Sequence, residues 1–284
     1  IIMDEIADLE EYKFMFKQRL ISGIILVLIA AFGLYMGGVV TFAMTLVVAL
    51  IGYSEILKIY HIEKSSLAVI GYTGTILYYV ALFFDLEQWT TAIIILFLIF
   101  LLGCYVVRFP KYKVDQMMAA FFGFVYVGVM MSFIYQIREL QNGGEFVVLL
   151  FLAAWGNDTL AYCTGMLIGK HKMSPILSPK KSIEGLIGGI VGAAILGALY
   201  GMYLNTYIRF SFNPVTMFPI ICGLGGAVSV IGDLAASAIK RDSGIKDYGT
   251  LIPGHGGILD RFDSIIFIAP VIYYLTVMIS GGAI

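Results

Sequence analysis

The sequence predicts an all-α integral membrane protein that crosses the bilayer about nine times. The chain of 284 residues is 60% hydrophobic and only 13% charged, which is more apolar than one soluble core of this length requires. Its mean hydropathy is +0.93, and stretches of about 20 apolar residues, the length that spans a bilayer, recur along the chain. The net charge of −1 gives no basic field for nucleic-acid binding.

The expected spans follow one another from residue 20 to the C-terminal end. They are 20–36, 39–57, 66–84, 89–107, 114–136, 146–169, 183–204, 215–239 and 262–280. Segment 1–19 places Ile6, Leu9 and Phe16 among charges, which predicts an amphipathic helix along the membrane interface. We therefore expect an interfacial segment (1–19), a scaffold of N-terminal transmembrane helices (20–145) and C-terminal transmembrane helices that carry the site (146–284).

The distribution of Lys and Arg predicts the orientation. With nine spans, all but two of the 18 basic residues fall on the side of the N-terminus, and only Arg138 and Arg209 lie opposite. Because cytoplasmic loops are enriched in Lys and Arg, we expect a cytoplasmic N-terminus in a multi-pass protein of the bacterial inner membrane. The two longest loops on that side, 170–182 and 240–261, are the least apolar parts of the chain, so chemistry should face the cytoplasm.

Two carboxylates lie deep inside predicted spans. An ionised Asp158 or Asp233 at mid-span costs about 2.5 to 3.5 kcal/mol on insertion scales, and Asp260 and Asp263 flank the start of the last span. A Mg²⁺ ion bound by Asp233 and Asp260 would remove their mutual repulsion and prepare a phosphate site, with a second cation left open. The alternative is that each buried carboxylate pairs with a lysine or a backbone donor.

Two polar segments combine cations with glycines, as phosphate-binding sites do. Segment 237–263 holds four basic residues, five glycines and His255, whereas segment 178–185 places two lysines before a helix start that Ser182 can cap. The lysines could also be ordinary topogenic charge. The candidate substrate-binding residues are Lys180, Ser182, Glu184, Ser237, Arg241, Lys246, His255, Gly256, Gly257 and Arg261.

Segment 237–263 resembles the signature of the phosphatidate cytidylyltransferase family. The matching residues are Ser237, Lys240, Arg241, Lys246, Asp247, Gly249, Pro253, His255, Gly256, Gly257, Asp260, Arg261 and Asp263. Upstream, Asp158, Ala161, Tyr162, Gly165, Gly169, Ser178, Pro179, Lys181, Glu184 and Gly185 match a second characteristic stretch. Ser182 stands where many members carry Thr, and Asn157 stands where a small residue is common. The resemblance covers about residues 155–265.

The resemblance implies that CMP passes from CTP to phosphatidic acid, giving CDP-diacylglycerol and pyrophosphate with the help of Mg²⁺. On this reading Asp233 and Asp260 hold the metal, and the catalytic residues are Lys181, Lys240, Asp263 and Asp158. Lys181, Lys240 and Arg261 would neutralise phosphate charge, with the backbone around His255 against the nucleotide. Lipid would enter from the bilayer and CTP from the cytoplasm.

Two other functions fit parts of the pattern. A CTP-dependent kinase of a polyprenol-type lipid would use similar residues but release CDP. A secondary transporter also has intramembrane acids and glycine-broken helices, but here the polar residues gather at one face. The glycines that run through spans 183–204 and 215–239 favour close helix packing, and a homodimer is a further expectation drawn from them.

Overall fold

The computed structural model describes residues 2–280, without the side chains of residues 2–16 and of residue 19. Its helices are α1 (Ile2–Met36), α2 (Gly38–Ile59), α3 (Ser66–Phe83), η1 (Glu87–Trp89), α4 (Thr90–Val107), α5 (Val114–Gly123), η2 (Phe124–Val129), α6 (Met130–Glu139), α7 (Gly143–Phe151), η3 (Leu152–Gly156), α8 (Asn157–Ile168), α9 (Ile183–Asn205), α10 (Pro214–Asp242) and α11 (Leu259–Ile279). The all-α prediction is confirmed.

Eight helical segments within the described residues are long and apolar enough to cross a membrane. They are Gly38–Ile59, Ser66–Phe83, Glu87–Val107, Val114–Glu139, Gly143–Ile168, Ile183–Asn205, Pro214–Asp242 and Leu259–Ile279. The expected first span corresponds to a shorter apolar segment, Leu20–Met36. It continues the helix that begins at Ile2, so the expected interfacial segment and first span form one helix, α1. The side chains on which the amphipathic prediction rests, Ile6, Leu9 and Phe16, lie outside the described ones.

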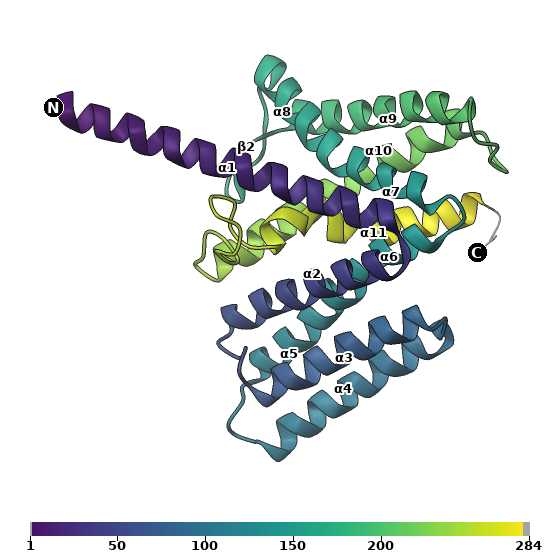
Figure 1. Cartoon of the computed structure of the whole chain (residues 1–284). Coiled ribbons are helices and arrows are strands. Elements are labelled where there is room, and N and C mark those ends of the chain that lie inside the picture. Colours follow the sequence, from purple (N-terminus) through teal and green to yellow (C-terminus); the bar gives the residue numbers. More distant parts are fainter. Residues whose placement is uncertain (1, 281–284) are drawn as a thin grey trace.

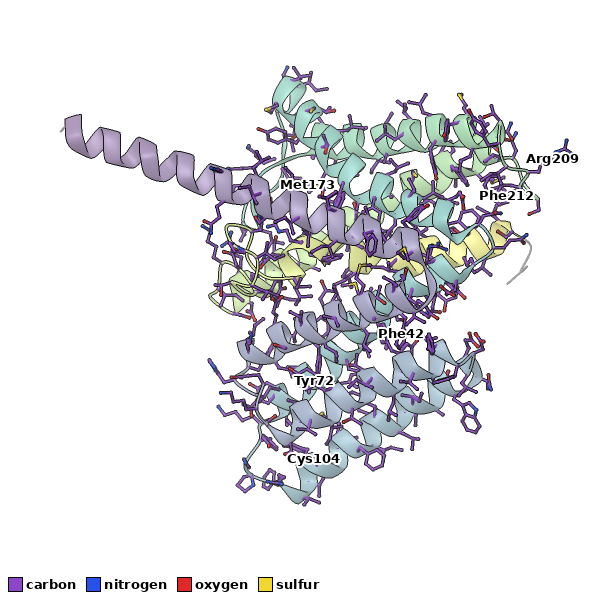
Figure 2. All side chains as sticks on the ribbon, viewed as in Figure 1. Phe42, Tyr72, Cys104, Met173, Arg209 and Phe212 are labelled. Atoms are coloured by element: carbon purple, nitrogen blue, oxygen red, sulfur yellow. The ribbon has the colours of Figure 1, made fainter. Side chains whose placement is uncertain are left out.

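The helices alternate in direction, so the connections gather at two ends of the bundle. In Figure 1, α3, α4 and α5 form one side and α8, α9 and α10 the other, with α2, α6 and α11 between them. The two termini lie at opposite ends. Figure 2 places Arg209 at the end away from the N-terminus, and Arg138 there donates from Nε to the carbonyl oxygen of Leu34 at the end of α1 (2.7 Å).

Short polar residues mark the helix starts that the sequence predicts. The hydroxyl of Ser65 accepts from the backbone N–H of Ala68 at the start of α3. Asn213 accepts from Val215 at the start of α10, where Pro214 occupies the first turn and needs no hydrogen-bond partner for its nitrogen. These side chains satisfy N–H groups that a helix leaves unpaired at its N-terminal end.

Two spans contain π-helical turns. The segment η2 joins α5 to α6, and η3 joins α7 to α8 directly before Asn157. Each π turn holds one residue more than an α turn, so it changes the direction in which the following side chains point.

The glycines of α9 and α10 confirm the packing interpretation. A Cβ at Gly189 would lie 2.8 Å from the Cβ of Ala161 in α8, and a Cβ at Gly201 would collide with the carbonyl oxygen of Pro214 in α10. The most extensive helix contacts in the structure are those of α9 with α10 and with α8. The homodimer expectation rested on these glycines, which here serve contacts within the chain; the oligomeric state itself stays a prediction.

The loop 170–182 contains a small hairpin, made of β1 (Lys172–Ser174) and β2 (Ser178–Ser182), that the sequence did not predict. Glu184 closes its base. One carboxylate oxygen accepts from the backbone N–H of Lys170 (3.1 Å), and the other pairs with Nδ1 of His171 (2.6 Å). The hairpin carries Lys180 and Lys181 to the start of α9.

Candidate active site

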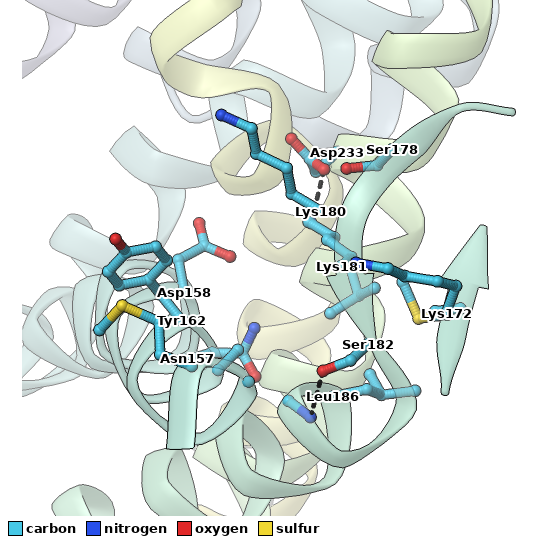
Figure 3. A pocket seen from close by; sticks show the side chains of 16 residues that line it. Asn157, Asp158, Tyr162, Lys172, Ser178, Lys180, Lys181, Ser182, Leu186 and Asp233 are labelled. Atoms are coloured by element: carbon cyan, nitrogen blue, oxygen red, sulfur yellow. Dashed lines mark hydrogen bonds and ion pairs between the residues drawn. The ribbon is translucent and has the colours of Figure 1, made fainter. Parts of the chain in front are cut away.

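A cavity of about 540 Å³ lies between the hairpin and helices α8, α9 and α10. Charged and hydroxyl side chains lie on both sides of it, from α8 and from the hairpin and α10, with apolar side chains among them (Figure 3). Its lining consists of Asn157, Asp158, Ala161, Tyr162, Gly165, Met166, Lys172, Met173, Ser178, Lys180, Lys181, Ser182, Gly185, Leu186, Val230 and Asp233. Five of the predicted site residues therefore share one cavity: Asp158, Lys180, Lys181, Ser182 and Asp233.

An ion pair crosses this cavity from the hairpin to α10. Nζ of Lys181 lies 2.5 Å from Oδ2 of Asp233, and about three tenths of each side chain is exposed (29% and 28%). The sequence alone could not pair them, because 52 residues separate them along the chain. A half-buried pair of this kind leaves both charges partly open to the cavity.

Asp158 faces the same cavity from α8, on the side opposite Lys181 (Figure 3). It interacts electrostatically with both Lys181 and Asp233. Asp263, on the first turns of α11, interacts with Asp233, Asp158 and Lys240. The two intramembrane acids and Asp263 thus lie close enough to interact with one another.

Ser182 caps α9, as predicted. Its hydroxyl accepts from the backbone N–H of Gly185 (3.1 Å), and the residue is buried. The cap fixes the turn from β2 into α9, and that turn directs Lys181 toward Asp233. The positive end of the α9 dipole consequently lies beside the two lysines, an arrangement that favours anions.

Asp260 is buried at the start of α11 and has its own lysine. Oδ1 accepts from Nζ of Lys240 (2.8 Å), and Oδ2 accepts from the backbone N–H groups of Tyr248 (2.8 Å) and Gly257 (2.9 Å). Lys240 also lies over the ring of Tyr248, 5.3 Å from its centroid. Asp260 thereby holds together the loop that connects α10 to α11.

Tyr248 fixes the same loop to α10. Burial raises the pKa of its hydroxyl above the ordinary value, so the group stays protonated and donates to the carbonyl oxygen of Ala236 (3.0 Å). The sequence offered no reason to select this residue, because a single tyrosine in a polar loop is compatible with many environments.

The glycine-rich turn of this loop packs against the protein itself. Gly256 has a φ of +86°, and a Cβ there would lie 2.7 Å from Oδ2 of Asp260. His255 contacts α1, with Nδ1 2.9 Å from the hydroxyl of Ser22, and its carbonyl oxygen accepts from Nε of Arg261 (3.0 Å). The role of His255, Gly256 and Gly257 toward a nucleotide stays a prediction.

The remaining predicted residues lie around this loop and do not line the cavity. Arg241, Lys246 and Arg261 are exposed, and Ser237 is half-buried on α10. Glu184 is engaged at the base of the hairpin. The roles of these five side chains toward a substrate stay predictions.

The two predicted metal ligands have separate partners in this structure. Asp233 pairs with Lys181, whereas Asp260 pairs with Lys240. Among the side chains that the structure describes, no three from His, Cys, Asp or Glu are arranged as a metal site. In this structure Asp233 and Asp260 therefore follow the alternative prediction, in which each carboxylate pairs with a lysine. Metal binding stays a proposal.

Two buried polar residues near the site escaped the sequence analysis as functional candidates. Asn157 lies at the floor of the cavity, fully buried, and its Nδ2 donates to the hydroxyl of Ser229 in α10 (3.2 Å). Glu55, from α2, accepts from the backbone N–H groups of Ile258 and Leu259 (both 2.9 Å). The sequence signal available for Glu55 was an acidic residue within one turn of the end of a predicted span.

Comparisons with known proteins extend the similarity beyond the segment that the motifs cover. Residues 17–279 match the profile of the Cytidylyltransferase family. The chain is 32% identical over 269 residues to the phosphatidate cytidylyltransferase of Staphylococcus saprophyticus, covering 93% of this chain and 100% of that protein. The corresponding values are 33% over 266 residues for Staphylococcus epidermidis (92% and 99%) and 35% over 269 residues for Staphylococcus aureus (92% and 99%). The similarity includes the N-terminal spans, for which the motifs gave no functional signal.

Proposed function

The chain belongs to the Cytidylyltransferase family, and from this premise we propose that it transfers CMP from CTP to phosphatidate, forming CDP-diacylglycerol and pyrophosphate. The observation that supports this best is the ion pair between Lys181 and Asp233 inside a cavity of about 540 Å³. The cavity offers cations and hydroxyls to phosphates and an apolar wall to a lipid. Its volume lies within the range of small-molecule sites.

The reaction joins two anions, so charge neutralisation is the main requirement. A phosphate oxygen of phosphatidate attacks the α-phosphorus of CTP, and the bond from that phosphorus to the oxygen bridging to the β-phosphorus breaks. The electron pair leaves with pyrophosphate. Lys181 neutralises the developing charge from the hairpin, and Lys240 does so from α10, as lysines do in phosphoryl-transfer sites.

The acidic side chains fit a hard divalent cation. Asp158, Asp233 and Asp263 lie close enough to interact with one another, and carboxylate oxygens are the ligands that Mg²⁺ prefers. Asp233 and Asp260 would hold Mg²⁺, with Asp158 and Asp263 shaping the site and room for a second cation. When bound, Mg²⁺ stabilises charge on the transferred and leaving phosphates.

The two ion pairs suggest how the protein remains stable before loading. Lys181 neutralises Asp233 and Lys240 neutralises Asp260 while substrate is absent. With Mg²⁺ and CTP bound, both lysines would face phosphate oxygens in place of their carboxylates. The same four side chains would then serve both states, and none of these four charges would be left without a partner in either one.

Lipid reaches the cavity along the apolar part of its lining. Tyr162 and Met166 of α8 are exposed (67% and 63%) and line the cavity together with Leu186 of α9. Acyl chains would contact these side chains while the phosphate reaches the hairpin lysines. We place this opening at the cytoplasmic face of the bacterial inner membrane, because the basic loops lie at that end.

A product assay tests the function. Purified protein in detergent micelles receives CTP labelled in the α-phosphate, together with phosphatidate and Mg²⁺. We expect label in a lipid and release of pyrophosphate. Release of CDP with a γ-phosphate on the lipid would instead show a lipid kinase, and solute flux in proteoliposomes without any lipid product would show a transporter.

The metal proposal has its own test. Asp233→Asn and Asp260→Asn should each abolish turnover while the protein stays membrane-inserted, because one ligand charge is lost. Asp242→Asn is the matched control, since this residue is exposed at the end of α10. Near-normal activity in either of the first two variants, at any Mg²⁺ concentration, would refute the assignment.

A further inference from the structure

The start of α11 is fixed by a carboxylate from the other half of the chain. Glu55, near the end of α2, is 1% exposed. Its Oε1 accepts from the backbone N–H of Ile258 and its Oε2 from that of Leu259, both at 2.9 Å. Both N–H groups belong to the helix start, where no carbonyl within the helix can pair with them.

This contact explains two glycines of the connecting loop. A Cβ at Gly249 would lie 2.6 Å from Oε1 of Glu55, and a Cβ at Gly257 would collide with the same carboxylate. The loop therefore closes around the Glu55 carboxylate, and any larger residue at either position would displace it. The helix α2 also packs here one turn earlier, where a Cβ at Gly52 would lie 3.0 Å from Leu259.

The neighbouring carboxylate, Asp260, depends on the same helix start. Leu259 and Asp260 are adjacent, and Asp260 accepts from the N–H groups of Gly257 and Tyr248. Glu55 and Asp260 together pair with four backbone N–H groups of one short stretch. Moving Leu259 would move Asp260 and, one turn later, Asp263.

We propose that Glu55 is a positioning residue of the active site, which holds the α11 start so that Asp260 and Asp263 face the metal and the phosphates. This rests on the proposed function. Glu55 itself touches neither substrate nor metal; it acts through the backbone of Ile258 and Leu259. Loss of partners that orient metal ligands typically costs about 10- to 100-fold in metal affinity or activity.

The decisive variant is Glu55→Gln, which keeps the size of the side chain. Its amide has one acceptor oxygen, so one of the two N–H groups loses its partner and faces an NH₂ group. We expect kcat to fall by about 10- to 100-fold. The Mg²⁺ concentration for half-maximal activity should rise, whereas the KM for phosphatidate should stay within about twofold because the lipid wall is untouched.

Mn²⁺ affinity, measured by electron paramagnetic resonance on the monodisperse fraction, provides a readout that needs no turnover. We expect it to weaken by about 10- to 100-fold in Glu55→Gln. Ser65→Ala is the matched control, because it removes an N-terminal cap from α3, away from the cavity. Ser65→Ala should lower thermal stability and leave kcat and Mn²⁺ affinity unchanged.

A second variant covers the case in which Glu55→Gln does not fold. Gly249→Ala keeps the glutamate at position 55 but displaces its carboxylate, so the same loss of Mn²⁺ affinity is expected. Wild-type kcat and Mn²⁺ affinity in the folded fraction of either variant would overturn the proposal. An equal loss of Mn²⁺ affinity in Ser65→Ala would also overturn it, because the effect would then follow from reduced thermal stability. Wild-type protein that makes no CDP-lipid would refute the proposed function instead, while the Mn²⁺ comparison would still decide on Glu55.

Discussion

Replacing Lys181 by Met separates the role of this residue in stability from its role in catalysis. Met keeps the length of the apolar stem and removes the charge. In the ligand-free protein the change leaves Asp233 without its ion-pair partner. In the reaction it removes one cation from the phosphates, so the two consequences can be measured independently.

The geometry of the pair sets the two magnitudes. Both side chains are about three tenths exposed (29% and 28%). The burial of this pair is therefore intermediate between that of exposed pairs, which contribute about 0 to 1 kcal/mol, and that of buried pairs, whose disruption costs about 3 to 5 kcal/mol. We therefore expect a loss of stability of about 1 to 2 kcal/mol. Loss of a group that stabilises transition-state charge costs about 2.7 to 4 kcal/mol, or 10²- to 10³-fold in kcat.

The assay measures CDP-diacylglycerol formation and thermal unfolding on the same preparations. Lys64→Met is the matched control, because Lys64 is exposed in a loop outside the cavity, and it should leave both quantities near wild type. Lys181→Arg keeps the charge and should retain more activity than Lys181→Met. A kcat within threefold of wild type in Lys181→Met, or full recovery in the double variant Lys181→Met with Asp233→Asn, would refute the catalytic role.

Two further predictions concern the helices that frame the cavity. Ser182→Ala removes the cap of α9 and should lower stability by about 1 kcal/mol, read as a lower melting temperature in detergent; an unchanged melting temperature would contradict the cap. Gly201→Ala places a methyl group against the carbonyl oxygen of Pro214 and should cost about 1 to 3 kcal/mol by overpacking. Gly103→Ala is its control, because a Cβ there has no neighbour within 4 Å and should be neutral or slightly stabilising. Equal melting temperatures for the two glycine variants would show that the α9–α10 contact is looser than the structure indicates.

The spans were predictable because the thickness of the bilayer sets the length of an apolar helix that crosses it. The helix start at Ser182 was also predictable, since a hydroxyl before a glycine-rich apolar run satisfies free N–H groups in any context. The boundary expected at residue 20, between the interfacial segment and the first span, is not the end of a helix, because nothing at that position terminates one: α1 runs through it. A change from charged to apolar composition alters the surroundings of a helix without ending it.

The partners within the site could not be predicted from the sequence. The identities of Asp158, Asp233 and Lys181 indicated chemistry, but the pairing of Lys181 with Asp233 depends on the hairpin, whose strands are only three and five residues long. The contact that Glu55 makes was harder still to predict. Its importance depends on the fold of a loop about 200 residues further along the chain, and no local pattern records a contact at that separation.

The π-helical turn Leu152–Gly156 makes the sixth span sensitive to length in an unusual way. It ends directly before Asn157 and Asp158, and each residue of an α-helix adds a rotation of about 100°. Because a π turn holds one residue more than an α turn, deleting one residue within Leu152–Gly156 would convert it to an α turn and leave the Asp158 carboxylate facing the cavity, whereas the same deletion within α7 would rotate Asp158 by about that angle. Single-residue loss in this span should therefore be tolerated best within the π-helical turn itself.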